Sequence, residues 1–455
     1  MNTKALRQKI LDLAIHGKLV PQDPNDEPAS VLLERIRAEK ERLIKEGKIK
    51  RPKKTKATSD KPHYENVPFE IPDNWVWTTL GEIFTLQAGK NITAKDIYTE
   101  KSEEFKYPCF GGNGIRGYVA ISNKIGEYPI IGRQGALCGN INLVHGIFYA
   151  TEHAVVVERY CDTDLMWGYY TLIALNLNQY ATATAQPGLA VNVINDVAIP
   201  LPPLHEQQRI SKLIKILFSF LDAIECKKLY LKTAISQTKT KVLDLAIHGR
   251  LVPQDPTDEP ATELLKRINP KAEITSDNGH YQKLPEGWCE CKLSDVCVFD
   301  NGYAFSSDNY YDCGIPLIRI SNITNTGSID LSSCVFIQDV PSNKFIVKSG
   351  DLLIAMSGAT TGKMGVYLYE EDALLNQRVG NLKCTDAMLQ QYRNYYMFAK
   401  SDYILKIAYG GAQPNISAKA ILDIDVMLPP LNEQHRIVAK IEEIFAQLDA
   451  IETSL

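Results

Sequence analysis

The feature that most constrains this chain is a 44-residue stretch, from His205 to His248, that contains neither proline nor glycine. Apolar residues recur along it in alternating steps of four and three, and only Lys228 and Thr238 interrupt the series. This heptad spacing predicts one helix, about 66 Å long, whose apolar seam needs a partner helix from elsewhere in the chain or from another subunit. The seam residues are Ile210, Ile214, Leu217, Leu221, Ile224, Leu231, Ile235, Val242 and Leu245.

Both halves of this stretch are duplicated elsewhere in the chain. Residues 201–225, LPPLHEQQRISKLIKILFSFLDAIE, match residues 428–452, LPPLNEQHRIVAKIEEIFAQLDAIE. The 28 residues that begin at Lys241 differ at only six positions from those that begin at Lys9, KILDLAIHGKLVPQDPNDEPASVLLERI. Such similarity indicates an internal duplication.

The order of the repeated pieces predicts a circular, pseudo-two-fold arrangement. Each LDLAIHG segment is followed by a long insert and then by an LPPL-x-EQ segment, and the central pair of segments is fused into one helix. Symmetry then requires the two termini to meet and form a second, broken copy of that helix. The alternative is two independent domains joined by a helical linker.

We therefore predict an α+β fold, in which two β-rich mixed domains are separated by an antiparallel coiled coil of long helices. Short β-prone runs broken by glycine fill both inserts, and residues 165–180 are typical of a helix. The predicted segments are an N-terminal helical half-repeat (1–61), a first insert domain (62–200), a central helical region (201–283), a second insert domain (284–427) and a C-terminal helix (428–455).

Helix ends can also be predicted. Leu6, Ile10 and Leu13 form one face of a first helix over residues 3–16, which Gly17 can end. Pro28 suits the first turn of a second helix that runs to about Lys45. His16 and its duplicate His248 each precede a glycine, so we expect them to cap helix C-termini.

Composition and motifs exclude several classes of function. The net charge of −4 argues mildly against nucleic-acid binding on bulk charge but does not exclude it, because local patches set the field that phosphates meet. No apolar run is long enough to span a membrane, and ten scattered cysteines fit a reducing compartment. Gly358–Lys363 has three residues between its glycines where a P-loop has four, and Met364 stands where Ser or Thr is needed. Cys289, Cys291 and Cys297 lack a second C-x2-C pair for zinc. We find no catalytic constellation and expect no cofactor or metal on this chain.

Twelve lysines and arginines fall between Arg35 and Lys61, among them Lys53, Lys54 and Lys56. A solvated helix end with a linker would explain this basic stretch, and so would a contact to phosphates or to an acidic partner. The sequence leaves both explanations open.

The two LPPL-x-EQ-x-RI segments, each closing an insert of roughly 140 residues, carry a resemblance. The whole chain resembles the specificity subunit of type I restriction-modification systems. The resemblance implies a non-catalytic, cytoplasmic protein whose inserts are target recognition domains, each reading half of a split double-stranded DNA sequence. It also implies two methyltransferase (modification) subunits that bind S-adenosylmethionine and methylate adenine N6. Where restriction subunits are present, they bind ATP and Mg²⁺ and cleave.

Geometry agrees with such a role, because two readers on a rigid rod contact two half-sites only at a fixed separation. Arginine reads guanine, and asparagine or glutamine reads adenine, so polar residues in exposed glycine loops are the candidates. In the first insert they are Asn113, Arg116, Arg133, Gln134, Gln186 and Asn192. In the second insert they are Arg319, Asn322, Ser357, Lys363, Gln377, Arg378, Gln413 and Asn415. The competing classes are a coiled-coil scaffold with two binding heads that does not bind DNA, and a silent recombination cassette.

Overall fold

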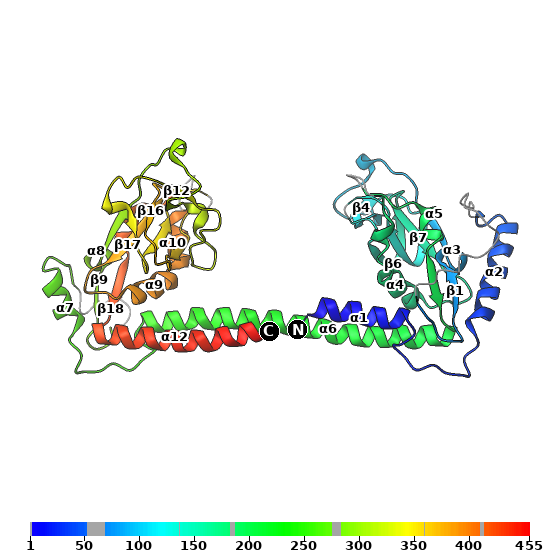
Figure 1. The fold of residues 1–455 in the computed structure, drawn as a ribbon, viewed down its shortest axis with the longest axis horizontal. Coiled ribbons are helices and arrows are strands. Elements are labelled where there is room, and N and C mark those ends of the chain that lie inside the picture. Colours follow the sequence, from blue (N-terminus) through cyan, green and yellow to red (C-terminus); the bar gives the residue numbers. More distant parts are fainter. Residues whose placement is uncertain are drawn as a thin grey trace. The chain divides into compact units, whose positions relative to one another are not determined.

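A computed structural model describes residues 2–51, 69–135, 137–182, 187–274, 284–358, 360–409 and 414–455. The chain forms two compact units, Met1–Lys227 and Lys228–Leu455, and the 44-residue helix α6 (Leu204–Ile247) belongs to both. Each unit combines a β-rich domain with helices (Figure 1). The predicted mixed fold with two β-rich domains and one long central helix is therefore confirmed.

The first unit is built around a six-stranded sheet with the order β2-β7-β5-β6-β3-β4. Its longest strands pair antiparallel over eight positions, from Lys124 opposite Phe148 to Ile131 opposite Ile141. The strands are β2 (Thr85–Ala88), β3 (Tyr107–Gly111), β4 (Gly114–Val119), β5 (Lys124–Gly132), β6 (Ile141–Ala150) and β7 (Ala154–Glu158). The helices α3 (Leu80–Ile83), α4 (Leu165–Ala174) and α5 (Val191–Asn195) complete the domain.

The second unit divides its strands between two four-stranded sheets, ordered β10-β17-β14-β15 and β12-β11-β16-β13. The first sheet holds β10 (Cys297–Asn301), β14 (Leu352–Ala355), β15 (Met364–Val366) and β17 (Val379–Cys384). The second holds β11 (Ile315–Ile318), β12 (Val335–Ile337), β13 (Ile346–Val347) and β16 (Ala373–Leu375). Its helices are α8 (Leu293–Val296), α9 (Gln390–Ala399), α10 (Ser401–Ala408) and α11 (Ala418–Leu422).

A small two-stranded ladder joins the beginning and the end of each insert. In the first unit β1 (Val76–Thr79) pairs antiparallel with β8 (Ala198–Leu201), and in the second β9 (Cys289–Lys292) pairs with β18 (Asp425–Leu428). Each ladder delivers the chain directly into a long helix, α6 or α12 (Leu431–Ser454). This shared exit explains why the two inserts have similar ends in sequence although their middles differ.

In the first unit, α1 (Thr3–Ile15) lies antiparallel along the first part of α6 (Figure 1). The Arg7 guanidinium lies 4.9 Å from the centre of the Phe218 ring and pairs with Asp222, whereas Gln22, beyond the end of α1, bonds to Glu206 at the start of α6. The antiparallel direction predicted for the seam is therefore found within this unit.

The second unit repeats the arrangement with α12 along the later part of α6 (Figure 1). Lys239 lies over the Phe445 ring and pairs with Asp449, and Gln254 bonds to Glu433 near the start of α12. The seam residues Ile210, Ile214, Ile437 and Ile441 are buried. The predicted meeting of the two termini concerns the placement of the two units and stays a prediction.

The packing of α1 differs from the sequence prediction. Leu6 is 39% exposed, and Ile10 and Leu13 are only half-buried, while the buried residues of the helix are Leu11 and Ala14. They join Trp167 and Ile210 in one apolar core. Because α1 contacts α4 as well as α6, its buried face is turned away from the face that a simple two-helix seam would bury.

The predicted helix ends are confirmed, except that Pro28 lies one residue before the first turn of its helix. His16 is the C-cap of α1, and its Nδ1 lies 2.6 Å from the Asp12 carbonyl oxygen, as the His248 Nδ1 does from the Asp244 carbonyl. Pro28 is the N-cap of α2 (Ala29–Lys45), and Pro260 holds the same place before α7 (Ala261–Ile268). Among the described residues, no helix combines the length and apolar character needed to cross a membrane.

Candidate nucleic-acid interface

In each insert a glycine loop follows an equivalent strand and is held by equivalent main-chain hydrogen bonds. After β5, Gly139 N donates to Gly132 O over 2.7 Å, and after β14, Gly362 N donates to Ala355 O over 2.8 Å. Gly135 and Gly358 sit at equivalent points with φ of +88° and +90°, a conformation that favours glycine. The described residues of 133–139 and 356–362 therefore belong to equivalent loops.

A second loop lies against each glycine loop through the main chain. Arg133 N donates to His153 O over 3.0 Å in the first unit, and Met356 N donates to Arg378 O over 2.9 Å in the second. The segment Thr151–His153 between β6 and β7 is therefore the structural equivalent of Asn376–Arg378 between β16 and β17.

Two further segments complete the arrangement. Leu189 N donates to Arg133 O over 2.9 Å and Ile416 N to Met356 O over 3.0 Å, so the end of each insert pairs with the glycine loop. The end of β3 and the end of β11 join through Thr151 N to Phe110 O, 2.9 Å, and Asn376 N to Ile318 O, 3.1 Å. We call the four joined segments of each unit its recognition surface: the described residues of 110–116, 132–135 with 137–140, 151–153 and 187–189 in the first, and of 318–322, 355–358 with 360–363, 376–378 and 414–416 in the second.

Four of the predicted residues of the first insert lie on its recognition surface. Asn113 and Arg116 are exposed at the turn after β3 and on β4, Gln134 is exposed in the glycine loop, and Arg133 is half-buried beside it. The neighbouring Gly112 approaches Gln134 and His153 so closely that an added Cβ would lie 3.2 Å and 3.3 Å from their carbonyl oxygens. The turn and the two loops are therefore in contact.

Asn192 lies elsewhere, on α5, and Gln186 lies outside the described residues. Asn192 borders a groove between β2 and the end of α2, together with Lys48, Lys50 and Arg51. None of the segments described above connects Asn192 to the glycine loop. Its predicted role in base reading stays a prediction.

In the second insert Gln377, Arg378 and Asn415 are exposed on the recognition surface, and Ser357 is half-buried opposite Asn415. Two other candidates, Arg319 and Lys363, have neighbours within the protein. Arg319 donates to the Ser333 carbonyl over 3.3 Å and lies over the Tyr310 ring. Lys363 borders a groove beside Lys239 and Phe445. Gln413 lies outside the described residues.

Asn322 is only 1% exposed. Its Oδ1 accepts from the Arg319 main-chain N–H over 2.9 Å, and its Nδ2 donates to the Asp330 carbonyl over 2.9 Å. These bonds hold the turn after β11, which favours a structural role for Asn322 over contact with a base.

Glu152 and His153 on the first recognition surface were not singled out from the sequence. Their positions correspond to Gln377 and Arg378, which were. The signal available in the sequence was weak: ATEHAVVVE and LNQRVGNLK both place three polar residues between two apolar strands, but they share no motif. Only the backbone pairing makes the equivalence plain.

The described part of the basic stretch is largely paired with carboxylates of the same unit. Arg37 pairs with Glu82, Arg51 with Glu41, and Arg42 lies 4.0 Å from both Glu39 and Glu46. Buried Lys40 instead donates to the carbonyl oxygens of Gly81, Glu82 and Phe84. This pairing favours a helix stabilised by its own charges, and residues 52–68, with Lys53, Lys54, Lys56 and Lys61, lie outside the described part.

The LPPL-x-EQ-x-R signature forms a buried clamp between helix and insert. The Glu206 carboxylate accepts from the Trp75 indole N–H over 2.9 Å and from the Gln22 amide over 2.7 Å. In the second unit the Glu433 carboxylate accepts from Trp288 over 2.9 Å and from Gln254 over 3.0 Å. The side-chain amide of the next residue, Gln207, is also hydrogen-bonded within the protein. Its Nε2 donates to the Pro202 carbonyl oxygen, and its Oε1 accepts from the Asp164 main-chain N–H.

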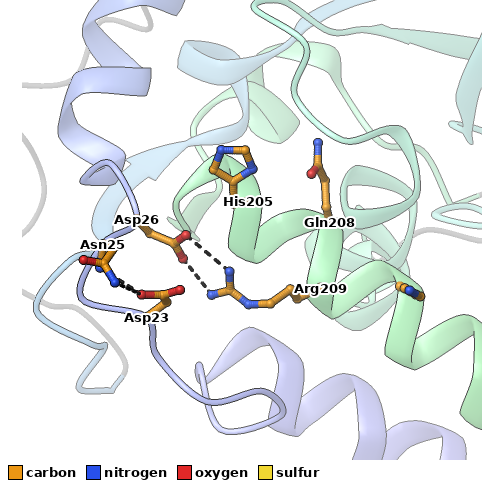
Figure 2. A pocket seen from close by; sticks show the side chains of 7 residues that line it. Asp23, Asn25, Asp26, His205, Gln208 and Arg209 are labelled. Atoms are coloured by element: carbon orange, nitrogen blue, oxygen red, sulfur yellow. Dashed lines mark hydrogen bonds and ion pairs between the residues drawn. The ribbon is translucent and has the colours of Figure 1, made fainter.

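The arginine of the signature anchors the loop that leads into α2 or α7. Arg209 forms a bidentate ion pair with Asp26, 2.6 Å and 3.2 Å, whose two bonds are drawn in Figure 2. Arg436 pairs with Asp258 in the same way, over 2.7 Å and 3.4 Å. The residues that carry the resemblance are thus structural residues, and the recognition surfaces lie elsewhere.

Burial governs the protonation of the two clamp glutamates. It raises the pKa of Glu206 above its usual value, and the hydrogen bonds from Trp75 and Gln22 oppose the rise. The pKa of Glu433 is raised for the same reason, against the bonds from Gln254 and Trp288.

The chain is similar to known proteins over nearly all of its length. A family model described as "Type I restriction modification DNA specificity domain" matches residues 72–233 and 285–455. The EcoAI specificity subunit of Escherichia coli is 29% identical over 97% of this chain and 88% of its own length. The EcoprrI specificity subunit of E. coli is 42% identical, over 37% of this chain and 41% of its own.

Solved structures support the fold. A chain from a structural study of the assembly and conformational transition of the type I R-M system aligns with a TM-score of 0.58 at 18% identity, covering 85% of this chain and 94% of that one. The HsdS subunit of Thermoanaerobacter tengcongensis aligns with a TM-score of 0.50 at 17% identity, covering 85% and 93%. The two duplicated units described above thus have a fold that is also present in these solved structures.

Proposed function

This chain belongs to the family of type I restriction-modification DNA specificity proteins, and from that premise we propose that it reads a DNA target made of two half-sites, one with each recognition surface. It is a recognition subunit and not a catalytic one, like the specificity subunits to which it is similar. Its ligand is double-stranded DNA.

One observation carries this proposal. Each unit holds the same four loop segments with the same main-chain bonds, yet the polar side chains on these segments differ, with Gln134 and His153 in one unit and Ser357 and Arg378 in the other. A common frame with different polar side chains is what two readers of different base sequences need, because specificity resides in the groups that reach base edges.

We further propose that the helical pairs dock two methyltransferase subunits, and restriction subunits where these exist. In this assembly S-adenosylmethionine, ATP and Mg²⁺ are bound by the partner subunits, methylation is at adenine N6, and the complex acts in the cytoplasm. The helices α1, α6 and α12 carry the duplicated residues, so equivalent surfaces are available in the two units.

An exchange of one insert tests the proposal. Residues 62–200 are replaced by the corresponding insert of a relative, the full chain is produced with its modification subunits, and the methylated sequences are determined across a genome. We expect one half of the target to change and the other half to stay. A change in both halves would refute the modular reading.

Binding to duplex DNA at increasing salt concentration separates this function from that of a protein adaptor. Counterion release makes the logarithm of the binding constant fall linearly with the logarithm of salt concentration. A complex that binds no duplex at any salt concentration would favour the adaptor.

A further inference from the structure

We propose that His153, with Glu152 beside it, reads the first half-site at the same relative position at which Arg378, with Gln377 beside it, reads the second. The inference rests on the proposed function and extends it, because it assigns a specificity-determining pair in each unit and states that equivalent loops read equivalent base positions.

The backbone places the two pairs identically within their own units. Each loop is tied at three points: to the glycine loop, to the end of β3 or β11, and to the residue that follows the edge strand β2 or β10. The third tie runs from Gly89 N to Ala154 O, 3.0 Å, in the first unit and from Gly302 N to Val379 O, 3.1 Å, in the second. With three equivalent ties, the Cα atoms of His153 and Arg378 start from the same place on the common frame.

The side chains of the first pair have unused hydrogen-bonding capacity. Glu152 Oε1 lies 3.1 Å from His153 Nε2, which leaves Glu152 Oε2 and His153 Nδ1 without a partner among the described residues. Arg133 Nε and Asn142 Nδ2 are likewise buried and without a hydrogen-bond partner among the described residues. Arg133 joins His153 through the main chain, and Asn142 pairs with Ile130 two residues before the glycine loop.

Unpaired polar atoms are costly when they are shielded from water, so a group of them around one loop points to a ligand that supplies partners. Base edges in the major groove offer both donors and acceptors. The unpaired atoms here are one carboxylate oxygen, on Glu152, and three nitrogens, on His153, Arg133 and Asn142. Such a mixture matches base edges better than it matches a row of phosphates, because phosphates would be bound by cations alone.

The chemistry of the pairs predicts how an exchange changes the target. Arginine makes two hydrogen bonds to guanine, glutamine makes two to adenine, and a carboxylate accepts from the cytosine amino group. His153→Arg should therefore introduce a preference for guanine at one position of the first half-site. Arg378→His should remove a preference for guanine at the equivalent position of the second.

The test uses the full chain with its modification subunits and a pool of DNA duplexes of randomised sequence, from which bound molecules are selected and sequenced. We expect His153→Arg to enrich guanine at one position of the first half-site by about ten-fold or more, with the second half-site unchanged. His145→Arg is the matched control, because His145 on β6 also lies 3.1 Å from a glutamate, Glu127, but outside the recognition surface.

Several outcomes would overturn the inference. A His153→Arg variant that keeps the wild-type preference, loses affinity equally for all sequences or alters the second half-site would do so, as would an Arg378→His variant with an unchanged second half-site. If the wild-type complex selects no sequence at all, the proposed function itself fails. Because the two variants change different units, a folding defect in one leaves the other as a test.

Discussion

The Trp75 indole N–H and the Glu206 carboxylate, 131 positions apart in the chain, form a 2.9 Å hydrogen bond at the base of the first insert. Trp288 and Glu433 form the same bond at the same distance in the second unit. In each unit the bond connects the beginning of an insert to the long helix that follows its end. It thereby joins the recognition domain to its helical support.

Replacing Trp75 by Phe should lower the free energy of unfolding of the first unit by about 1–3 kcal/mol, because a buried carboxylate loses a donor. Trp288→Phe should have a similar effect on the second unit. Chemical denaturation of the full chain measures both. Trp77→Phe is the control, since Trp77 is only half-buried on β1; equal losses in Trp75→Phe and Trp77→Phe would mean that the clamp adds nothing beyond ring packing.

The clamp glutamate should also make stability depend on pH. The native state binds the Glu206 proton more tightly than the unfolded chain does, because its pKa is raised above the ordinary 4.5. Its contribution to stability is therefore fully present below pH 4.5 and is lost as the pH rises through the raised pKa. We would measure the free energy of unfolding of the wild type and of Glu206→Gln from below pH 4.5 upward. The value for the wild type minus that for the variant should fall as the pH rises. A difference of the opposite slope would mean that the hydrogen bonds outweigh burial.

The Arg209–Asp26 pair should be worth more than an exposed pair in the same unit. The Asp26 side chain is only 6% exposed, and its carboxylate accepts hydrogen bonds from both terminal nitrogens of the Arg209 guanidinium. The side chains of Arg35 and Glu27, by contrast, are about half exposed. A double-mutant cycle with Arg209→Ala and Asp26→Ala should give a coupling energy above about 1 kcal/mol. The same cycle on Arg35 and Glu27 should give less than about 1 kcal/mol, and equal couplings would contradict the distinction.

Arg378→Ala should reduce affinity by about 1–3 kcal/mol and relax the preference at one base of the second half-site. Arg133→Ala should do the same for the first if its guanidinium reaches a base edge. Selection from randomised duplexes distinguishes this from a uniform loss over all sequences, which would assign the arginine to a phosphate.

The helical framework could be predicted because its signals are local or repeated. Heptad spacing identified α6, proline and histidine identified helix ends, and the near-identity of residues 9–36 with 241–268 identified the duplication. The buried face of α1 could not be predicted, since it depends on α4, which arrives from more than 150 residues later in the chain.

The candidate site was predictable only in part, for a related reason. Glycine-rich loops indicated Arg133, Gln134, Gln377 and Arg378, but the equivalence of His153 and Arg378 is created by strand pairing between segments without a common motif. Asn322 had the composition of a base reader, yet its amide serves the turn in which it lies. Likewise, Glu206 and Arg209 signalled the family while contributing to architecture.

The loops of each recognition surface are tied together by N–H and C=O groups of the main chain, as between Arg133 and His153. Such ties place no demand on the identity of the side chains that they carry. We therefore predict that mutation at positions 133, 134, 152 and 153 alters the target without weakening the domain. A lineage that gains from changing which DNA it marks could move between targets through single substitutions, each leaving a folded protein for selection to act on.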